Sequence, residues 1–318
     1  MRKTIQVFMG FLCSLAVASG TLPTEKSSAA AQKLLDDARF ADARASEEGF
    51  LIRAVIRFGE GKGEEVEGHY LLAWASPARW REEFSLSDFR QVRVSAPGGV
   101  WEIREPNFLS LRLWQLMQAF NFYGRFNLQS EESAGKIKLR KNNGSELRCI
   151  DITRESYPLR ELCFQEGAAQ LVSEHYIPSD RWYKFSDYRA IHSKFFPGHI
   201  IVLDGKTLAA DFSVSSVEET VPTTLFEPPA QAGWRPWCAS PQSGGDPLTP
   251  IFSGSVKHQG VATLYGAIGT DGQWHDVHVL ESGGASHDAE VLEALKKERW
   301  RPTLCNGVPI VVETVFRR

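Results

Sequence analysis

The sequence lacks an excess of charge of either sign, and beyond its N-terminus it lacks a long hydrophobic run. Its 318 residues carry 36 Lys and Arg against 39 Asp and Glu, a formal net charge of −3. Without a basic field, the chain is not expected to bind nucleic acid. No later segment approaches the roughly 20 apolar residues of a membrane-spanning helix. With 42% apolar and 24% charged residues, the composition is typical of a soluble globular protein long enough for two domains.

Motifs for nucleophilic catalysis are also missing. The chain has no Gly-x-Ser-x-Gly, no Cys-Gly-x-Cys-Trp and no Ser-x-x-Lys with its companion motifs. Acidic pairs such as Glu82-Glu83 are adjacent in sequence, so on a strand their side chains diverge. The glycine-rich Gly59-Glu-Gly-Lys-Gly63 has no Lys-Ser/Thr ending or following helix and is typical of a hairpin loop. We therefore expect no catalytic site and no cofactor; an envelope hydrolase with a dispersed site stays as a third alternative.

Histidines offer little for a metal ion. The closest cluster is His275, Asp276 and His278. Alternate residues of a strand face opposite sides, so the two histidines are predicted to point apart and not to share an ion. No metal site is expected.

The first eighteen residues read as a secretory leader. Arg2 and Lys3 form a charged start, Ile5 to Val17 an apolar centre, and Ala16-Val17-Ala18 a small-x-small cleavage site. Cys13 follows Phe11-Leu12, whereas a lipoprotein signal has small residues before its cysteine. We expect a periplasmic protein, with an uncleaved leader and membrane association left open.

Four cysteines remain after such a leader, an even number for an oxidising compartment. Cys149 and Cys163 lie on consecutive strand-like runs joined by a turn, so hairpin pairing would place them opposite each other. A bridge between Cys238 and Cys305 would pin a linker to the last domain. For each pair, two buried free thiols are the alternative.

Proline marks the domain boundary, because seven of the sixteen prolines lie between Val221 and Gly254. The N-terminal part has an amphipathic run at Ala29 to Ala45 and a helical run at Asn107 to Phe120, among ten or more β-prone runs. The predicted fold class is α+β. The predicted layout is a signal peptide (1–18), an N-terminal curved antiparallel sheet (29–220), a Pro-rich linker (221–254) and a small C-terminal ββαβ domain (255–318).

The N-terminal domain resembles the LolA/LolB-like half-barrel proteins. The resemblance lies in the runs Glu67 to Trp74, Pro77 to Phe84 and Phe195 to Lys206, set in a long antiparallel meander. It implies an apolar cavity for acyl chains on the concave face. Core and edge packing is the alternative role for the aromatic residues. The candidate cavity residues are Trp74, Trp80, Trp101, Leu113 and Trp114.

The C-terminal residues form a strand, turn, strand, helix and strand pattern. Val261 to Ile268 and Trp274 to Leu280 flank an Asp271-Gly272 turn. Asp288 to Lys297 places its leucines and valine on one helical face, and Pro302 prevents continuation of the helix. A last strand is expected from Val308 to Phe316.

This pattern resembles the C-terminal domain of TonB energy transducers. The shared residues are Asp271-Gly272, Val279-Leu-Glu-Ser282, Asp288 to Leu295, Arg299-Trp-Arg-Pro302 and Asn306-Gly-Val-Pro-Ile310, with departures at Trp274, His287 and Glu298. The resemblance implies that the last strand captures a peptide of an outer-membrane transporter or another envelope protein by edge-strand addition. The residues implied in this contact are Val308, Ile310, Val312, Thr314 and Phe316.

Two functions of different kinds follow. The first is a non-enzymatic periplasmic binding or transport protein that captures an envelope partner through its last strand. The second is a soluble lipid or lipoprotein carrier that uses the half-barrel cavity, with lipid as its partner and the C-terminal domain as a docking accessory.

Overall fold

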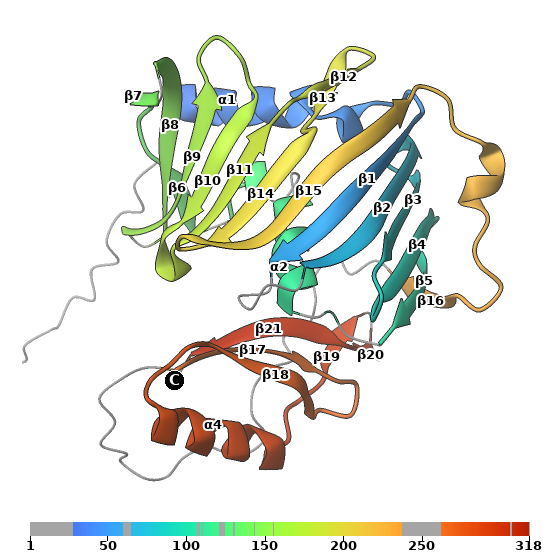
Figure 1. Cartoon of the computed structure of the whole chain (residues 1–318), viewed down its shortest axis with the longest axis vertical. Helices are drawn as coiled ribbons and strands as arrows, with labels where there is room; N and C mark the ends of the chain where they lie inside the picture. The colour runs from blue at the N-terminus through green and yellow to red at the C-terminus, as the bar shows by residue number, and fades with distance from the viewer. Residues whose placement is uncertain are drawn as a thin grey trace, which may run out of the picture.

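The computed structural model describes residues 28–59, 65–106, 109, 111–120, 125–129, 131–142, 144–154, 156–236, 262–305 and 307–317. Residues 28–236 form a half-barrel, and residues 262–317 form a smaller unit that we call the C-terminal module (Figure 1). The predicted leader and the end of the predicted linker lie outside the described residues.

One antiparallel sheet of fourteen described strands makes the half-barrel. Their order is β16-β5-β4-β3-β2-β1-β15-β14-β11-β10-β9-β8-β6, and β7 pairs with β8 beside β6. The predicted curved antiparallel sheet is confirmed. Its strands are β1 Phe50–Gly59, β2 Glu65–Ser76, β3 Arg79–Ser85, β4 Arg90–Ala96, β5 Gly99–Glu105, β6 Glu132–Ala134, β7 Lys138–Asn142, β8 Ser145–Arg154, β9 Tyr157–Gln165, β10 Leu171–Tyr176, β11 Arg181–Ser186, β14 His199–Asp204, β15 Thr207–Glu218 and β16 Gly233–Pro236.

Two helices pack on the concave face of this sheet. In α1 (Ala29–Ala41), the Ser28 hydroxyl accepts a hydrogen bond from the Ala31 N–H and caps the helix. In α2 (Leu111–Phe120), Leu113, Leu116 and Phe120 are buried on one face. The Phe120 ring centroid lies 5.0 Å from that of Tyr70 and 4.8 Å from that of Phe212. The helices therefore cover much of the concave face with side chains. Among the described helices, none is both long and apolar enough to cross a membrane.

The first half of the Pro-rich segment is part of the half-barrel. After the short helix η3 (Thr223–Phe226), β16 pairs with the free edge of β5, with Trp234 opposite Trp101. Arg81 donates hydrogen bonds to the carbonyls of Leu225 and Glu227. The predicted linker is therefore wrong for residues 221–236, because the unpaired β5 edge takes up this chain as a further strand.

The C-terminal module has the predicted strand, strand, helix and strand order. The helix α4 covers one face of a sheet ordered β18-β17-β21. The predicted single last strand is wrong. It is broken at Val311, because β20 forms a hairpin with β19 around Gly307 (φ 83°) and only β21 joins β17. The elements are β17 Thr263–Ile268, β18 Trp274–Glu281, α4 Ala285–Lys297, β19 Thr303–Cys305, β20 Val308–Ile310 and β21 Val312–Arg317.

The other face of this small sheet packs against the half-barrel near α2 (Figure 1). Tyr265 of β17 is fully buried there, its hydroxyl donates to the Leu109 carbonyl, and its ring lies 5.2 Å from that of Trp114. On β21, Glu313 pairs with Arg104 at 2.5 Å and accepts a hydrogen bond from the Leu109 N–H. These contacts hold the two parts together on either side of a cavity.

Candidate functional site

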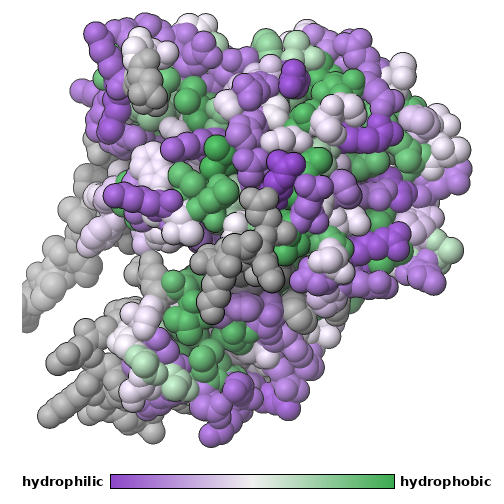
Figure 2. Space-filling view, in the orientation of Figure 1, coloured by the Kyte–Doolittle hydropathy of each residue, from purple (hydrophilic) through white to green (hydrophobic). Residues whose placement is uncertain are grey.

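A cavity of about 650 Å³ lies between the half-barrel and the C-terminal module. Strands β8 to β11 and β14, together with α2, line its half-barrel side, and β17, β18 and β21 line its module side. In space-filling view the surface is hollowed between the two parts, with apolar residues on the module side of the hollow (Figure 2).

The two walls of the cavity offer apolar side chains. On the half-barrel side these are Trp114 of α2 and Leu159 of β9, with Tyr176 at the end of β10. On the module side they are Val279 and Val315, which are 36% and 40% exposed. Such a lining would remove apolar ligand surface from water.

Charged residues form a row along the half-barrel wall. Glu174 of β10 pairs with Arg125 and, at 3.4 Å, with Arg160 of β9. Arg160 also pairs with Glu132 of β6 at 3.2 Å, and Glu132 pairs with Arg154 of β8 at 3.1 Å. We call this alternating set, Arg125–Glu174–Arg160–Glu132–Arg154, the arginine row. It brings side chains from five separate segments to one wall of the cavity.

A second ion pair lies beside the arginine row. Arg181 donates to Asp204 over 2.7 Å, and the Gln115 amide of α2 donates to the same carboxylate over 2.8 Å. The Arg181 guanidinium also lies 5.8 Å from the Trp114 ring centroid, within reach of a cation–π contact. Burial raises the pKa of the neighbouring Tyr183 phenol to about 12, although the positive charge of Arg181 acts to lower this pKa. Tyr183 is therefore neutral at physiological pH.

The structure does not bring the five predicted cavity residues together. Trp114 lines the cavity between the half-barrel and the C-terminal module. Trp74 and Leu113 belong to the half-barrel core, where the Trp74 indole donates to the Ser46 carbonyl over 2.9 Å. Trp80 packs on the concave side with the Arg93 guanidinium 5.2 Å from its ring. Trp101 lies on the opposite face. It pairs with Val94, which pairs with Arg81, and Arg81 alternates with Trp80 along β3.

The predicted partner-binding residues are also divided between elements. Val308 and Ile310 lie in β20. Val312 and Phe316 pair with Ile268 and Leu264, which face α4, so these two side chains point into the module. Thr314 lines the cavity, and within the described part of the chain β21 has β17 as its one strand neighbour. Whether this edge binds a peptide stays a prediction.

Sequence reasoning missed the arginine row. Its members are single charged residues within otherwise amphipathic strands, and a solvated position is the ordinary reading of such a residue. One signal is available in the strand alternation. Arg160 lies two residues before the buried Leu162 in β9, and Leu162 pairs directly with Glu174 of β10, so both charged residues lie on a buried face of the sheet. Seeing that signal requires the register of β9 with β10 as well as the sequence of either strand.

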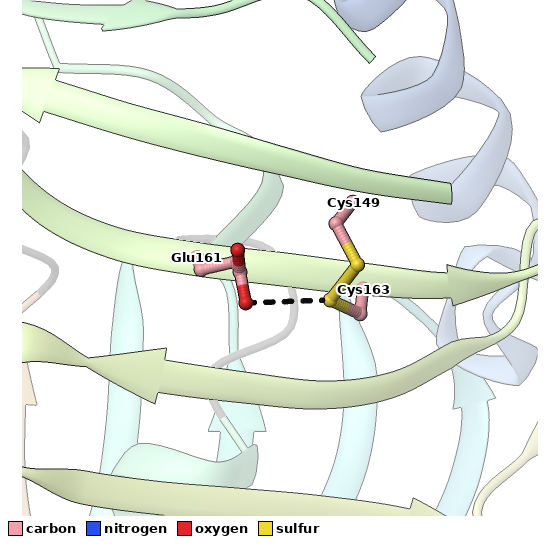
Figure 3. Close-up of side chains that lie close together, drawn as sticks. All are labelled: Cys149, Glu161 and Cys163. Carbon is pink, nitrogen blue, oxygen red and sulfur yellow. Dashed lines mark hydrogen bonds between the residues drawn. A yellow bond between two sulfur atoms is a disulfide. The ribbon is translucent and has the colours of Figure 1, made fainter. Parts of the chain in front are cut away.

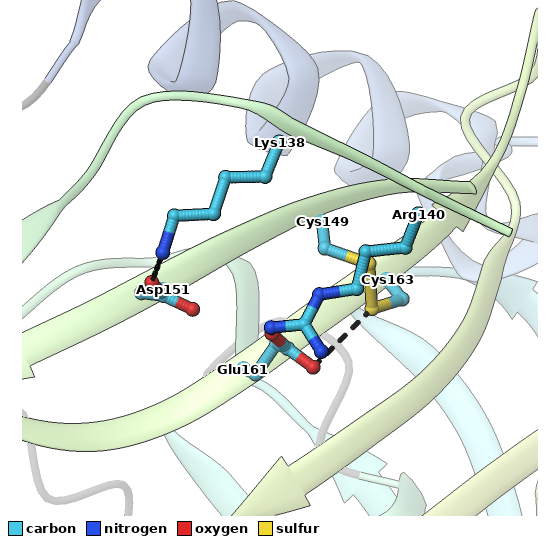
Figure 4. Close-up of a disulfide and its surroundings, with 6 residues drawn as sticks. All are labelled: Lys138, Arg140, Cys149, Asp151, Glu161 and Cys163. Carbon is cyan, nitrogen blue, oxygen red and sulfur yellow. Dashed lines mark hydrogen bonds and ion pairs between the residues drawn. A yellow bond between two sulfur atoms is a disulfide. The ribbon is translucent and has the colours of Figure 1, made fainter.

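The predicted Cys149–Cys163 disulfide is present, joining β8 and β9 on the convex face (Figure 3). Glu161 lies 3.7 Å from the Cys163 sulfur, and Arg140 and Lys138 pair with Glu161 and Asp151 nearby (Figure 4). Two cysteines and a carboxylate resemble a metal ligand set, but here the sulfurs are bonded to each other. Cys305 is also disulfide-bonded; its predicted partner, Cys238, lies outside the described residues, so that pairing stays a prediction.

The prediction that His275 and His278 point apart is wrong. Asp276 takes a positive φ of 48° and forms a bulge, so His275 pairs with Ala267 while His278 pairs with Tyr265. Both histidines therefore share one face of the sheet. Each contacts its own aspartate: His275 lies 3.3 Å from Asp271, and His278 lies 2.9 Å from Asp276.

No protein-family model matches the chain, and no curated protein matches it. Solved structures do match. A LolA superfamily protein from Nitrosomonas europaea is 14% identical, with 62% of this chain and 97% of that chain covered and a TM-score of 0.42. A DUF1329 family protein from Desulfovibrio piger is 12% identical, with 64% and 98% covered and a TM-score of 0.46. The MucA/MucB complex of Pseudomonas aeruginosa matches at 14% identity, 78% and 77% coverage and a TM-score of 0.30.

Proposed function

We propose that this chain is a non-enzymatic binding protein of the cell envelope that holds an acyl-bearing ligand, a lipid or a lipidated protein, between its half-barrel and its C-terminal module. The observation that carries the proposal is the cavity of about 650 Å³ with apolar side chains on both walls. Small-molecule sites in proteins typically measure about 300–1,000 Å³ and combine apolar walls with a few polar groups. The acyl chain would lie against Trp114, Val279 and Val315.

The charged residues of the cavity support binding in preference to catalysis. Glu132, Glu174 and Asp204 each pair with an arginine on the half-barrel wall, and Glu313 pairs with Arg104. Each guanidinium donates to the carboxylate oxygens and fixes their position, so these oxygens are engaged within the protein. These carboxylates therefore suit a scaffold role. The secretory leader expected from the sequence would place the protein in the periplasm.

The test is native mass spectrometry of the full chain expressed with its leader in a bacterial periplasm, followed by incubation with extracted envelope lipids. Val315→Glu places a charge on the apolar wall, and Val308→Glu makes the same change on β20, where the side chain is 53% exposed and does not line the cavity. We expect an acyl-bearing adduct on the unchanged protein and on Val308→Glu, and its loss on Val315→Glu. An unchanged protein that takes up no lipid would contradict the proposal.

A second candidate is capture of an extended peptide on β21, with an outer-membrane transporter or another envelope protein as partner. The observation that favours it is the regular six-pair register of β21 with β17, which leaves an unkinked outer edge in the described structure. A photo-cross-linker at Val311 should trap such a transporter, and one at Glu290 of α4 should not. Equal trapping at both positions would count against edge-strand addition.

A further inference from the structure

The arginine row carries more positive than negative charge. It has three arginines to two glutamates, with an arginine at each end. Arg125, Arg160 and Glu174 are only 4%, 9% and 5% exposed. A buried charge without a counter-charge is costly, because water no longer solvates it. Arg154 at one end is 46% exposed to water, whereas the buried members Arg125, Arg160, Glu132 and Glu174 balance one another in charge.

Two hydrogen-bond donors beside the row lack partners in the described structure. The Nε of Arg160 and the Oγ of Ser179 are buried, and neither is hydrogen-bonded among the described residues. Both residues line the cavity. They are neighbours, because Arg160 pairs with Tyr176 and the short helix η2 (Ile177–Ser179) follows Tyr176 directly. A buried donor without an acceptor is destabilising, so each favours an acceptor arriving with a ligand.

We propose that the ligand is an anionic amphiphile whose phosphate or carboxylate headgroup binds at Arg160 and Ser179. The headgroup oxygens accept hydrogen bonds from Arg160 Nε–H and Ser179 Oγ–H, and their negative charge faces the Arg160 guanidinium. Charge-assisted hydrogen bonds of this kind are about twice as strong as neutral ones. This assignment rests on the proposed function, since the acyl chain of the same ligand lies along the apolar walls.

Four probes test the assignment by isothermal titration calorimetry on the full chain: dodecyl phosphate, lauric acid, the neutral dodecyl glycerol and inorganic phosphate. Hydrogen bonds to charged groups contribute about 1.5–3 kcal/mol, so the two anionic amphiphiles should bind at least ~10-fold more tightly than the neutral one. Inorganic phosphate, which lacks the acyl chain, should bind at least ~100-fold more weakly than dodecyl phosphate, as burial of several CH₂ groups predicts.

Matched variants locate the headgroup. Arg160→Lys keeps the charge that Glu132 and Glu174 require but removes the Nε donor, and Ser179→Ala removes the hydroxyl at a turn. Each should weaken dodecyl phosphate binding about tenfold and leave dodecyl glycerol binding unchanged. Arg148→Lys is the control, because its Nε is also buried without a partner in the described part of the chain, but the side chain lies outside the cavity.

The outcomes separate the two proposals. Equal affinity for charged and neutral amphiphiles would overturn the headgroup site and leave the acyl-binding function standing. Binding of inorganic phosphate as tight as that of dodecyl phosphate would identify a free-anion site and overturn the amphiphile assignment. No binding of any dodecyl compound would overturn both. If Arg160→Lys does not fold, the Ser179→Ala series and the ranking of the four probes on the unchanged protein still decide the question.

Discussion

The phenol of Tyr265 donates a hydrogen bond to the backbone carbonyl of Leu109 over 2.9 Å, joining two parts of the chain that lie 156 residues apart. Leu109 is itself buried, and its N–H donates to Glu313 of the same module. Leu109 of the half-barrel thus contacts β17 through its carbonyl and β21 through its N–H. These two hydrogen bonds hold β17 and β21, which line the module side of the cavity, against the half-barrel.

Replacing Glu313 by Gln should loosen the docked module. The change removes the charge that faces Arg104, and both side chains are almost buried, at 13% and 10% exposure. Loss of a hydrogen bond to a charged group costs about 1.5–3 kcal/mol, so urea unfolding should show a decrease of that size. Hydrogen exchange should also become faster at Leu109 and β21. Glu293→Gln, on the exposed face of α4, makes the same chemical change and should alter neither measurement.

Removing the Cys149–Cys163 bridge should lower the free energy of unfolding by about 3 kcal/mol. The bridge closes a loop with a sequence separation of 14, and a loop of that length restricts the unfolded chain by roughly that amount. The double variant Cys149→Ser/Cys163→Ser should show this loss in urea unfolding. Because Cys305 is also bridged, dithiothreitol should destabilise both proteins, but the unchanged protein by about 3 kcal/mol more. An equal effect on both would refute the prediction.

Truncating Phe120 should destabilise the half-barrel strongly. Its ring packs against Tyr70, Phe212 and Phe84 at centroid distances of 5.0, 4.8 and 6.2 Å. Phe→Ala changes in such cores cost about 3–5 kcal/mol, because a cavity remains. Phe120→Leu keeps most of the volume and should cost clearly less. Thermal unfolding of both variants measures the difference, and a similar small loss for both would show that α2 is not anchored there.

Stability should fall steeply in alkali. Burial raises the pKa of Tyr70, Tyr188 and Tyr265 above their ordinary value, and that of Tyr183 to about 12. A pKa raised by folding favours the neutral phenol, so the contribution is present below pH 10 and is lost as pH rises toward 12 and beyond. Urea midpoints should decrease across this range, and phenolate absorbance should appear together with unfolding. Tyr183→Phe should flatten the decrease between pH 10 and 12.

Most strands could be predicted because their signals are local. Alternating apolar residues and turn residues indicated the many β-prone runs of the N-terminal domain, and the Asp271-Gly272 turn located the β17–β18 hairpin. The same local pattern could not reveal that residues 233–236 would become a strand. That outcome depends on an unpaired β5 edge more than a hundred residues earlier in the chain.

The site could be predicted only in part, because it forms where two units dock. Trp114 was identified as an aromatic cavity residue, and its cavity lies between part of the concave face and the C-terminal module, whereas α1 and α2 cover the rest of that face. The arginine row comes from five segments, and its assembly depends on strand registers that no short motif encodes. The bulge at Asp276 reversed the expected direction of a histidine, since one extra residue shifts the alternation.

The positive φ of Asp276 also shapes the outer edge of β18. A β18 edge with a flat, regular backbone would be a ready template for a strand of another molecule, the first step toward fibrous aggregates. The bulge bends that edge and interrupts its row of evenly spaced peptide groups. The bulge at Asp276 thus makes the β18 edge a poorer template for a strand of another molecule than the regular edge of β21.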